Sequence, residues 1–420
     1  MNELLYTVWL SLSCTPGADS FVKLISKFST PYNIFNADCE EIASCIGSKS
    51  RDYNSLVDKN TDKANQILKF CNDKNIGILT YFDKEFPKSL KEIKNPPILL
   101  YYRGVLPDFD NEFFVSIVGT RHLTPYGRKN TFTVANDLAR AGATIVSGMA
   151  IGIDGVALAG ALSAGKKTVA VLGSGIDICY PIHHKRLARE IVKLGCVITE
   201  YAPGTRPERF NFPVRNRIIS GLSKATLVME GRERSGAIIT ARHAKEQGRA
   251  VYAFPGNVGN ASSEASNLLI KNGAKLFTSA DDIVRDFENT SQGMLNPFKL
   301  SENTEIDMYS VLRELQISCV SSEDDIFKSP RTQRRSASPR LIEEAKPEIK
   351  ENIEMEQEVS SLFNKSVLAL YKKIPFNSDC SVEELVDEEH NLRDVMQGVL
   401  KLEIARFVTM LPGDRVKRNI

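Results

Sequence analysis

The sequence predicts an α/β protein built around a doubly wound parallel sheet, and two features of residues 113–254 carry that prediction. First, short apolar runs typical of buried strands alternate with amphipathic segments of helical period. Second, glycine-rich turns follow several of these strands. Parallel strands bring their carboxyl ends to the edge of the sheet where ligands bind, so we expect the turns to line one cleft. These turns are Gly119-Thr-Arg121, Ser147-Gly-Met-Ala-Ile-Gly-Ile-Asp154 and Gly173-Ser-Gly-Ile-Asp177.

Taken in order, the chain divides into five segments. Residues 1–74 have the apolar spacing of short helices, and residues 75–112 contain two strand-like runs that form a connector packed on the core. Residues 113–287 form the α/β domain. Residues 288–358 are predicted to be a disordered linker, because 321–352 is rich in charge, Ser and Pro. Residues 359–420 are predicted to form a winged helix.

Within the α/β domain the expected strands and helices follow one another closely. The expected strands are 114–118, 143–146, 168–172, 197–200, 225–230 and 250–254, and the expected helices are 126–141, 155–164, 184–194, 213–222 and 238–247.

Composition places the protein in the ordinary globular class. Of its 420 residues, 42% are hydrophobic and 25% are charged, and no apolar run is long enough to span a membrane. A short apolar run before Cys14 lacks the basic residues of a secretion signal, so we reject that reading. The eight cysteines have no paired spacing, which indicates reduced thiols in a cytoplasmic protein.

The charge is distributed unevenly along the chain. Residues 113–285 contain 23 Lys and Arg against 12 Asp and Glu, a balance of +11, so the remainder of this +2 protein sums to −9. A basic module inside acidic surroundings favours a polyanionic ligand for that module. By contrast, residues 361–420 contain nine cations and nine anions. A neutral winged helix favours a protein-contact or regulatory role over DNA reading.

The stretch from Asn211 to Ser223 holds the main candidate binding residues. Pro213 suits the first turn of a helix, and Phe212, Arg215, Asn216 and Arg217 would place a ring, two cations and an amide near its N-terminal end. Such groups suit phosphates and unstacked bases. A helix with two surface arginines and a core phenylalanine explains the segment equally well. Ser235 and Gly236 begin another helix, whose N-terminus favours a phosphate.

Two enzyme signatures fail on inspection. Gly160–Lys167 resembles a phosphate-binding loop, but Lys167 stands where Ser or Thr is required, and the segment ends a helix and precedes a strand, the reverse of the required order. Gly173-Ser-Gly175 lacks the third glycine of a dinucleotide site. Four carboxylates at strand ends are expected to hold arginines and turn amides, and we predict no catalytic residue, metal site or cofactor. These carboxylates are Asp154, Asp177, Glu200 and Glu230.

Taken together, these residues resemble the DprA/Smf family of bacterial DNA-processing proteins. The resemblance is carried by Val118-Gly-Thr-Arg121, Ser147–Asp154, Gly173–Pro181, Pro203-Gly204, Phe212–Ser223, Ser235–Ala241 and Pro255-Gly256, in order over the whole middle domain. The resemblance implies an extended Rossmann-like domain, an N-terminal SAM-like helical domain and a C-terminal winged helix. It also implies homodimers through the Rossmann-like domain, binding of single-stranded DNA without sequence preference, RecA loading, and a role in natural transformation.

The family's DNA site carries over to this chain residue by residue. The resemblance assigns it to Arg121 in the Gly119 turn, to Arg209 and Phe212, and to Arg215, Asn216 and Arg217, with turn contacts from Ser147, Gly148, Gly152, Ser235 and Gly236.

Departures from the family pattern lie outside the arginine-rich centre. Ile151 stands where a basic residue is frequent, and Leu158 stands where a histidine is usual; Ala265 and Ala405 replace common glycines. The alternative reading is a related Rossmann-type nucleoside-monophosphate hydrolase. Pro255-Gly-Asn-Val-Gly259 lacks the threonine of that group's signature, which argues against it. A winged-helix transcription regulator is a third reading, weakened by the neutral C-terminal module.

Overall fold

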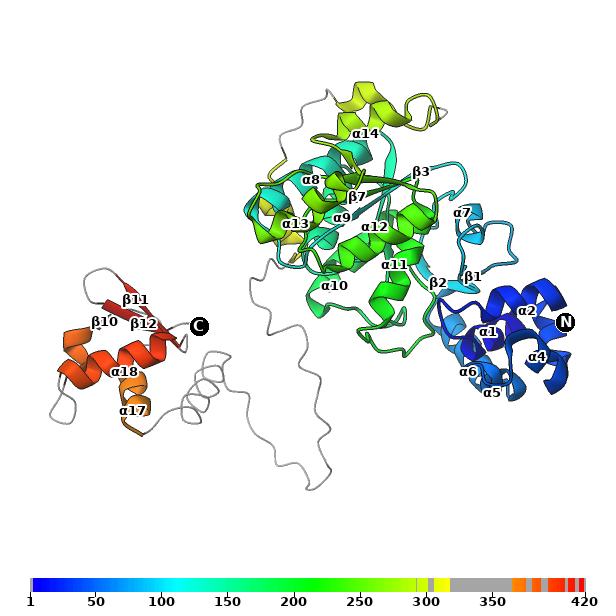
Figure 1. Cartoon of the computed structure of the whole chain (residues 1–420), viewed down its shortest axis with the longest axis horizontal. Coiled ribbons are helices and arrows are strands. Elements are labelled where there is room, and N and C mark those ends of the chain that lie inside the picture. Colours follow the sequence, from blue (N-terminus) through cyan, green and yellow to red (C-terminus); the bar gives the residue numbers. More distant parts are fainter. Residues whose placement is uncertain are drawn as a thin grey trace. The chain divides into compact units, whose positions relative to one another are not determined.

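The structure is a computed structural model of the chain and describes residues 3–291, 293–300, 306–317, 365–374, 380–386, 392–404, 407–411 and 415–418. The chain divides into two compact units, Met1–Phe327 and Lys328–Ile420 (Figure 1).

Six short helices form the first part of the larger unit. Local signals begin two of them: Thr30 caps α3 ahead of Pro31, and Asp38 forms a capping box with Glu41 at the start of α4. Their apolar sides enclose a core around Trp9, which is buried. The helical character agrees with the expectation, and the SAM-like assignment stays a prediction. The helices are α1 (Glu3–Ser13), α2 (Ser20–Phe28), α3 (Pro31–Asn36), α4 (Cys39–Ile46), α5 (Tyr53–Val57) and α6 (Asp62–Asp73).

A nine-stranded sheet forms the centre of this unit, in the order β1-β2-β6-β5-β4-β3-β7-β8-β9. All neighbouring pairs from β6 to β9 along this order are parallel, which confirms the predicted α/β class and mostly parallel sheet. The strands are β1 (Gly77–Thr80), β2 (Leu99–Gly104), β3 (Phe113–Val118), β4 (Ala143–Ser147), β5 (Thr168–Val171), β6 (Cys196–Thr199), β7 (Ala225–Val228), β8 (Ala250–Ala253) and β9 (Lys275–Leu276).

The predicted connector belongs to the sheet itself. β2 pairs antiparallel with β6, with Tyr101 opposite Thr199, and β1 continues the sheet beyond β2. Leu99 and Leu100 are buried with Tyr101, so this strand closes one side of the core. The expectation of a connector packed on the core missed this pairing, because the partner strand lies far along the chain and leaves no local signal.

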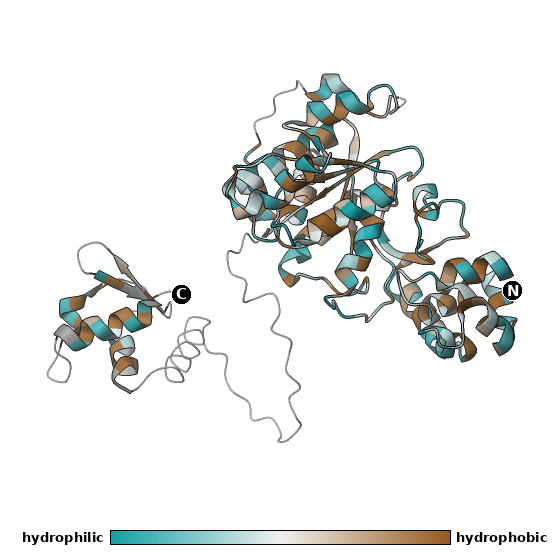
Figure 2. Ribbon diagram, viewed as in Figure 1, coloured by the Kyte–Doolittle hydropathy of each residue, from teal (hydrophilic) through white to brown (hydrophobic). Residues whose placement is uncertain are grey.

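Helices cover both faces of the sheet, as the burial of every residue of β3 requires. Phe113, Val115 and Ile117 pack in one cluster with α8, α9 and α14, whereas Phe114 and Val118 pack in another with α7, α11 and α12. Figure 2 shows hydrophobic residues along the strands, between helices that also carry hydrophilic residues. The helices are α7 (Lys88–Lys91), α8 (Pro125–Arg140), α9 (Ile153–Ser163), α10 (Lys185–Leu194), α11 (Asn211–Leu222), α12 (Gly236–Glu246), α13 (Glu264–Lys271) and α14 (Ala280–Phe287).

The order of the strands reverses at β3. The chain runs from β3 outward through β4, β5 and β6, and then returns to form β7 on the other side of β3. Val115 accordingly lies opposite Ile145 of β4 on one side and Ala225 of β7 on the other. Chain connections leave the carboxyl ends of β3 and β7 in different directions, and such a reversal opens a crevice there.

Helical structure continues beyond the predicted end of the α/β domain. Two elements lie inside the predicted linker: η3 (Pro297–Leu300) and α15 (Met308–Glu314). Leu295 packs in the cluster of α8 and α14, and Leu312, Leu315 and Ile317 pack in the cluster that contains α9 and α10. The linker boundary at residue 288 is therefore placed too early, because these four apolar side chains have partners on the sheet domain. Residues 318–364, with the Ser- and Pro-rich part of that linker, lie outside the described residues.

The smaller unit contains helices and a three-stranded antiparallel sheet. β11 and β12 pair with each other, and β10 pairs with the other edge of β12. Its core includes Tyr371, Val395 and Val416. The winged-helix assignment stays a prediction. The elements are α17 (Lys365–Lys373), β10 (Cys380–Ser381), η5 (Val382–Leu385), α18 (Leu392–Ile404), β11 (Val408–Leu411) and β12 (Arg415–Arg418).

No helix among the described residues is long and apolar enough to cross a membrane. No cluster of three or more His, Cys, Asp or Glu side chains within the described ranges is arranged to hold a metal ion.

We predict that a chain ending at Phe287 is less stable than one ending at Phe327. The shorter chain loses Leu295, Leu312 and Leu315, which are 5–6% exposed, and full burial of each such side chain contributes about 1.5–3 kcal/mol. Urea unfolding of the two truncated chains should show a lower midpoint for the shorter one. Both lack the smaller unit, so equal midpoints would show that the segment after α14 adds no stability.

Candidate nucleic-acid interface

A pocket of about 600 Å³ opens at the carboxyl ends of β3 and β7, where the strand order reverses. It is lined by the turn after β3, the turn before α9, the start of α11 with the residues before it, and the start of α12. Eight of the twelve predicted site residues line it: Gly119, Arg121, Arg209, Phe212, Arg215, Asn216, Ser235 and Gly236.

The turn after β3 places Arg121 at the pocket. The backbone N–H of Thr120 donates to the carbonyl of Glu230 (2.8 Å), and the N–H of Ile153 donates to the carbonyl of Thr120 (3.1 Å). A Cβ on Gly119 would lie 2.5 Å from Ile153 Cγ1, so only glycine lets these segments approach so closely. The turn is thus fixed by β7 on one side and α9 on the other.

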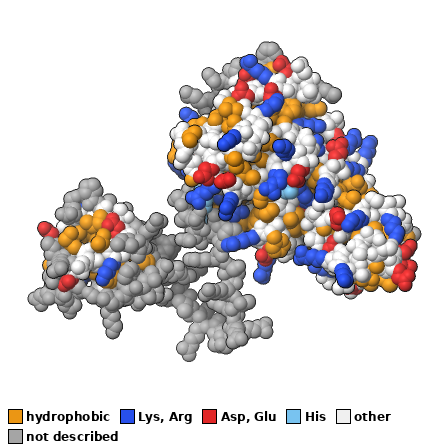
Figure 3. Space-filling view, in the orientation of Figure 1, with side chains coloured by type: hydrophobic (Ala, Val, Ile, Leu, Met, Phe, Trp, Pro, Cys, Tyr) orange, Lys and Arg blue, Asp and Glu red, His pale blue; other side chains and the backbone are white. Residues whose placement is uncertain are grey.

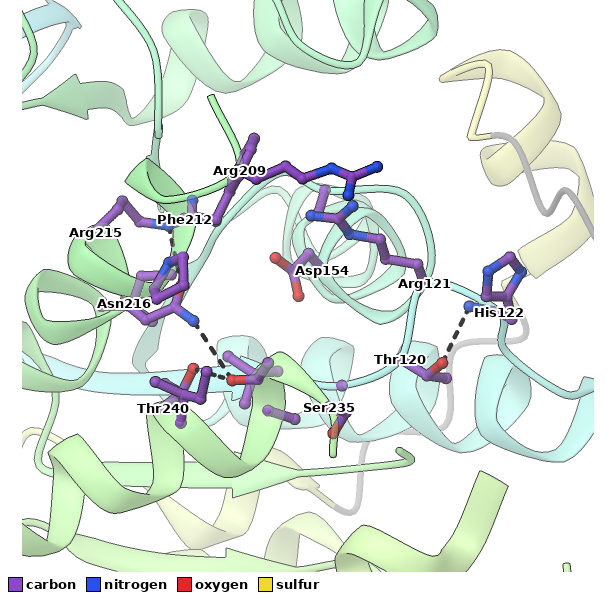
Figure 4. Close-up of a pocket in the computed structure, with 18 residues that line it drawn as sticks. Thr120, Arg121, His122, Asp154, Arg209, Phe212, Arg215, Asn216, Ser235 and Thr240 are labelled. Atoms are coloured by element: carbon purple, nitrogen blue, oxygen red, sulfur yellow. Dashed lines mark hydrogen bonds between the residues drawn. The ribbon is translucent and has the colours of Figure 1, made fainter. Parts of the chain in front are cut away.

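Arginines surround the ring of Phe212 beside the pocket. The Cζ atom of Arg121 lies 5.3 Å from the ring centroid, and that of Arg215 lies 5.9 Å from it. The ring of Tyr180 is 5.7 Å away. In Figure 4, the side chains of Arg121 and Arg209 reach toward the same region of the pocket from two different elements. Arg121, Arg209 and the ring of Phe212 therefore border one cavity.

Arg215 lines the pocket, but its main contacts are internal. It is 3% exposed, and its Nη1 donates to the carbonyl of Gly148 (2.9 Å) and to that of Val171. Its Nε donates to the side-chain oxygen of Asn216 (3.1 Å). The guanidinium thereby ties α11 to the turn after β4 and to the end of β5.

A buried carboxylate accompanies this arginine. Asp154 accepts a hydrogen bond from the N–H of Gly148 (3.1 Å). Burial raises the pKa of Asp154, and the charge of Arg215 opposes that rise. Burial also lowers the pKa of Arg215 to about 10, with Asp154 opposing the change. Because that value lies well above neutral pH, Arg215 carries its charge there.

Arg217 is drawn away from the pocket. Its two terminal nitrogens donate to the two carboxylate oxygens of Glu200 (2.6 and 2.7 Å), and its Nε donates to the carbonyl of Asn95 (2.9 Å). The two charged side chains are 7% and 6% exposed. This placement corrects the expectation that Arg217 faces a phosphate: the carboxylate and the carbonyl bind its guanidinium away from the cavity.

Three further predicted residues support the turns that form the pocket. Ser147 donates to the carbonyl of Ile117 (2.6 Å) and is fully buried. Gly148 lies against Arg215, and a Cβ there would approach its Nη2 to 2.5 Å. Gly152 has φ +88°, and its Cβ would lie 2.3 Å from the carbonyl oxygen of Thr120. These residues therefore position the turns and are not among the residues that line the cavity, and their contacts with a ligand stay a prediction.

The start of α12 forms the opposite wall. The carbonyl of Gly236 accepts from Thr240 Oγ1 (3.2 Å) and from Asn216 Nδ2 (3.5 Å), and both contacts are drawn in Figure 4. The hydroxyl oxygen of Ser235 is enclosed and has no hydrogen-bond partner among the described residues. The N-terminus of α12 at Gly236 suits an anionic group.

Some of the residues that line the pocket were not predicted from the sequence. Thr120, His122 and Thr240 border the pocket but were not predicted. Thr240 follows Gly236 by four residues, so helical spacing from the predicted Gly236 would have found it. Thr120 and His122 flank Arg121 directly.

The strand-end carboxylates act as the sequence indicated. Asp154 holds a turn amide, and Glu200 pairs with Arg217. Asp177 accepts from the N–H of Gly204 (2.9 Å), and Glu230 accepts from the N–H and the hydroxyl of Thr124. The expectation that these groups hold arginines and turn amides is confirmed.

The sequence model of the family described as DNA recombination-mediator protein A matches residues 77–288. The chain belongs to this family. The match covers all nine strands of the sheet and every segment that lines the pocket. The resemblance drawn from the sequence motifs is confirmed.

Individual relatives of the family extend this result. The DNA processing protein DprA of Bacillus subtilis is 36% identical over 56% of this chain and 80% of its own length, and that of Streptococcus pneumoniae is 43% identical over 49% and 72%. Protein Smf of Synechocystis is 41% identical over 52% of this chain and only 56% of its own length. The X-ray structure of DprA from Streptococcus pneumoniae is 33% identical and superposes with a TM-score of 0.58, covering 68% of this chain and 98% of that one.

We predict that Arg217→Ala lowers the free energy of unfolding by about 3–5 kcal/mol, because it leaves the buried carboxylate of Glu200 without its partner. Urea unfolding measures the loss. Replacing both partners by leucine is the matched control, and it should recover much of the stability, since no buried charge is then left unpaired. A loss below about 1 kcal/mol for Arg217→Ala would show that the pair is not buried as described.

We also predict that Gly152→Ala is far more disruptive than Gly248→Ala. Both glycines have positive φ, +88° and +69°, but a Cβ on Gly248 meets nothing within 4 Å, whereas one on Gly152 meets the backbone of Thr120 and Arg121. Backbone strain alone costs about 1–2 kcal/mol at either position, so Gly152→Ala should lose more stability by the added clash. Thermal melts of the two variants test this, and equal melts would contradict it.

Proposed function

We propose that this protein binds single-stranded DNA without sequence preference in the pocket at the ends of β3 and β7. The observation that carries the proposal is the convergence of Arg121, Arg209 and the N-terminus of α12 on one cavity beside the ring of Phe212. Cations and helix N-termini attract phosphates, and aromatic rings stack on bases of any sequence. The surrounding domain carries a charge of +11, and Figure 3 shows Lys and Arg side chains spread over the visible face of the larger unit.

The contacts divide into two kinds. Arg121, Arg209 and the N-terminus of α12 suit phosphate oxygens, and Asn216 and Phe212 suit a base or sugar. Arg215 contributes by holding the walls of the pocket together. None of the contacts needs a base of one kind, which favours binding without sequence preference.

Family membership supports a wider role as part of the same proposal. The family is described as a mediator of DNA recombination, and the bacterial relatives are named DNA processing proteins. We propose that the protein protects incoming single strands and loads the RecA recombinase onto them during natural transformation. We further propose that it works in the cytoplasm as a homodimer through its Rossmann-like domain. The C-terminal unit, neutral in charge, would serve protein contacts.

A binding role fits the carboxylate in the pocket better than hydrolysis of a nucleotide does. Asp154 is the acidic side chain among the described lining residues, and it is engaged by Gly148 and by the charge of Arg215. Incubation with deoxynucleoside monophosphates should leave them intact by chromatography. Release of free base would instead establish the hydrolase alternative.

We predict that replacing Arg121 and Arg209 together by alanine weakens binding to all single strands and flattens its salt dependence. If the wild type contacts about four phosphates, the log–log slope is about −3, and losing two contacts should reduce it by about 1.4. Fluorescence anisotropy with labelled oligonucleotides over a salt series measures both quantities. Lys271→Ala is the matched control, since Lys271 is exposed and does not border the pocket. An unchanged slope in the double variant would remove these arginines from the site.

A further inference from the structure

A second aromatic ring lies just outside the pocket and was not predicted from the sequence. Phe210 precedes the first residue of α11 and is 68% exposed. It ends a short turn in which the N–H of Glu208 donates to the carbonyl of Arg206 (3.0 Å) and the N–H of Asn211 donates to the carbonyl of Glu208 (3.0 Å). A single exposed apolar residue is common on protein surfaces and needs no explanation by itself. Its surroundings are what distinguish it.

Two cations precede this ring on the same turn, and the exposed Glu208 lies between them in the sequence. Arg206 and Arg209 are both exposed, and Arg209 also borders the pocket. An exposed ring with exposed cations close by in the chain is a combination that single-strand binding surfaces use, with stacking for the base and charge for the backbone. The turn therefore offers the same chemistry outside the pocket as inside it.

The ring inside the pocket is more enclosed than this outer one. Phe212 has the guanidinium groups of Arg121 and Arg215 at 5.3 and 5.9 Å and the ring of Tyr180 at 5.7 Å. Gly173 also lies against it, since a Cβ there would be 3.0 Å from its Cδ1. Phe210 has the larger free surface, and residues two apart at a helix start point to different sides. A strand that reaches Phe212 would meet Phe210 only by continuing over the rim of the pocket.

We propose that Phe210 forms a second base-binding subsite, on which a nucleobase adjoining the pocket-bound segment stacks while Arg206 and Arg209 contact the intervening phosphates. The inference rests on the proposed function, because it concerns the path of the same strand. It extends the binding surface from the cavity onto the turn at residues 206–210. The ligand class is a single-stranded oligonucleotide of any sequence.

The first test replaces the ring in the full chain. Phe210→Ala should weaken binding of an oligothymidylate by about 5- to 150-fold, the range for loss of one stacked base. The salt slope should stay unchanged because no charge is lost, and the thermal melt should stay unchanged because the ring is exposed. Tyr309→Ala is the matched control: Tyr309 is a 56% exposed aromatic on α15 that does not border the pocket, and its removal should leave affinity unchanged.

A second variant reports on the ring directly. The sequence has one tryptophan, Trp9, and it is buried. Phe210→Trp therefore adds a single exposed fluorophore and keeps a stacking face. We expect it to bind oligothymidylate as tightly as the wild type, with its emission quenched on binding. Duplex DNA of the same length should quench it less, because paired bases are not free to stack.

The outcomes separate this inference from the function on which it rests. If the wild type binds no single strands, the proposed function fails. If the wild type binds but Phe210→Ala binds equally well, or Phe210→Trp binds without quenching, only the outer subsite is overturned. If Phe210→Ala keeps its affinity but changes the oligomeric state by light scattering, the ring is a protein contact and the subsite is likewise overturned.

Discussion

The rest of the site depends on the hydrogen bonds that the buried guanidinium of Arg215 donates to backbone carbonyls. Arg215 joins three parts of the fold, because it lies on α11 and donates to carbonyls at the ends of β4 and β5. Asp154 supplies the opposite charge from the start of α9. A buried cation that lost these partners would be strongly destabilising. The position of Phe212 and Asn216 at the cavity is therefore set by an arginine whose own hydrogen bonds are internal.

The sequence was a good guide to the layers and to the cavity, because both follow from local patterns. Strand and helix periods predicted the α/β class, and the glycine turns at Gly119 and Gly152 indicated which edge of the sheet carries the site. The ring, cations and amide after Asn211 indicated α11, and the family resemblance then added Arg209. The pairing of β2 with β6 and the packing of Leu312 could not be predicted this way, since each depends on a partner distant along the chain.

The two arginines of α11 show where sequence reasoning about side chains stops. Arg215 and Arg217 look equivalent in a list of cations, but residues two apart on a helix point to different sides. One meets the carbonyls of Gly148 and Val171, and the other meets Glu200. Both partner sets come from other elements, so no local pattern distinguishes a ligand-binding arginine from a structural one. Phe210 is the opposite case: it looks like an ordinary apolar residue in the sequence, and its exposure is known only from the structure of the turn before α11.

The far side of α11 has a mechanical consequence for the whole larger unit. Arg217 binds the carbonyl of Asn95, whose side-chain amide donates to the carbonyl of Gly17 (2.6 Å) in the N-terminal helices. Val214 closes the same contact, since a Cβ on Gly17 would lie 2.8 Å from it. The helix α11 therefore borders the cavity on one side and contacts the N-terminal region, directly and through Asn95, on the other. The helices and the sheet should then melt as one cooperative block, so that heating releases the pocket and the N-terminal region in a single transition.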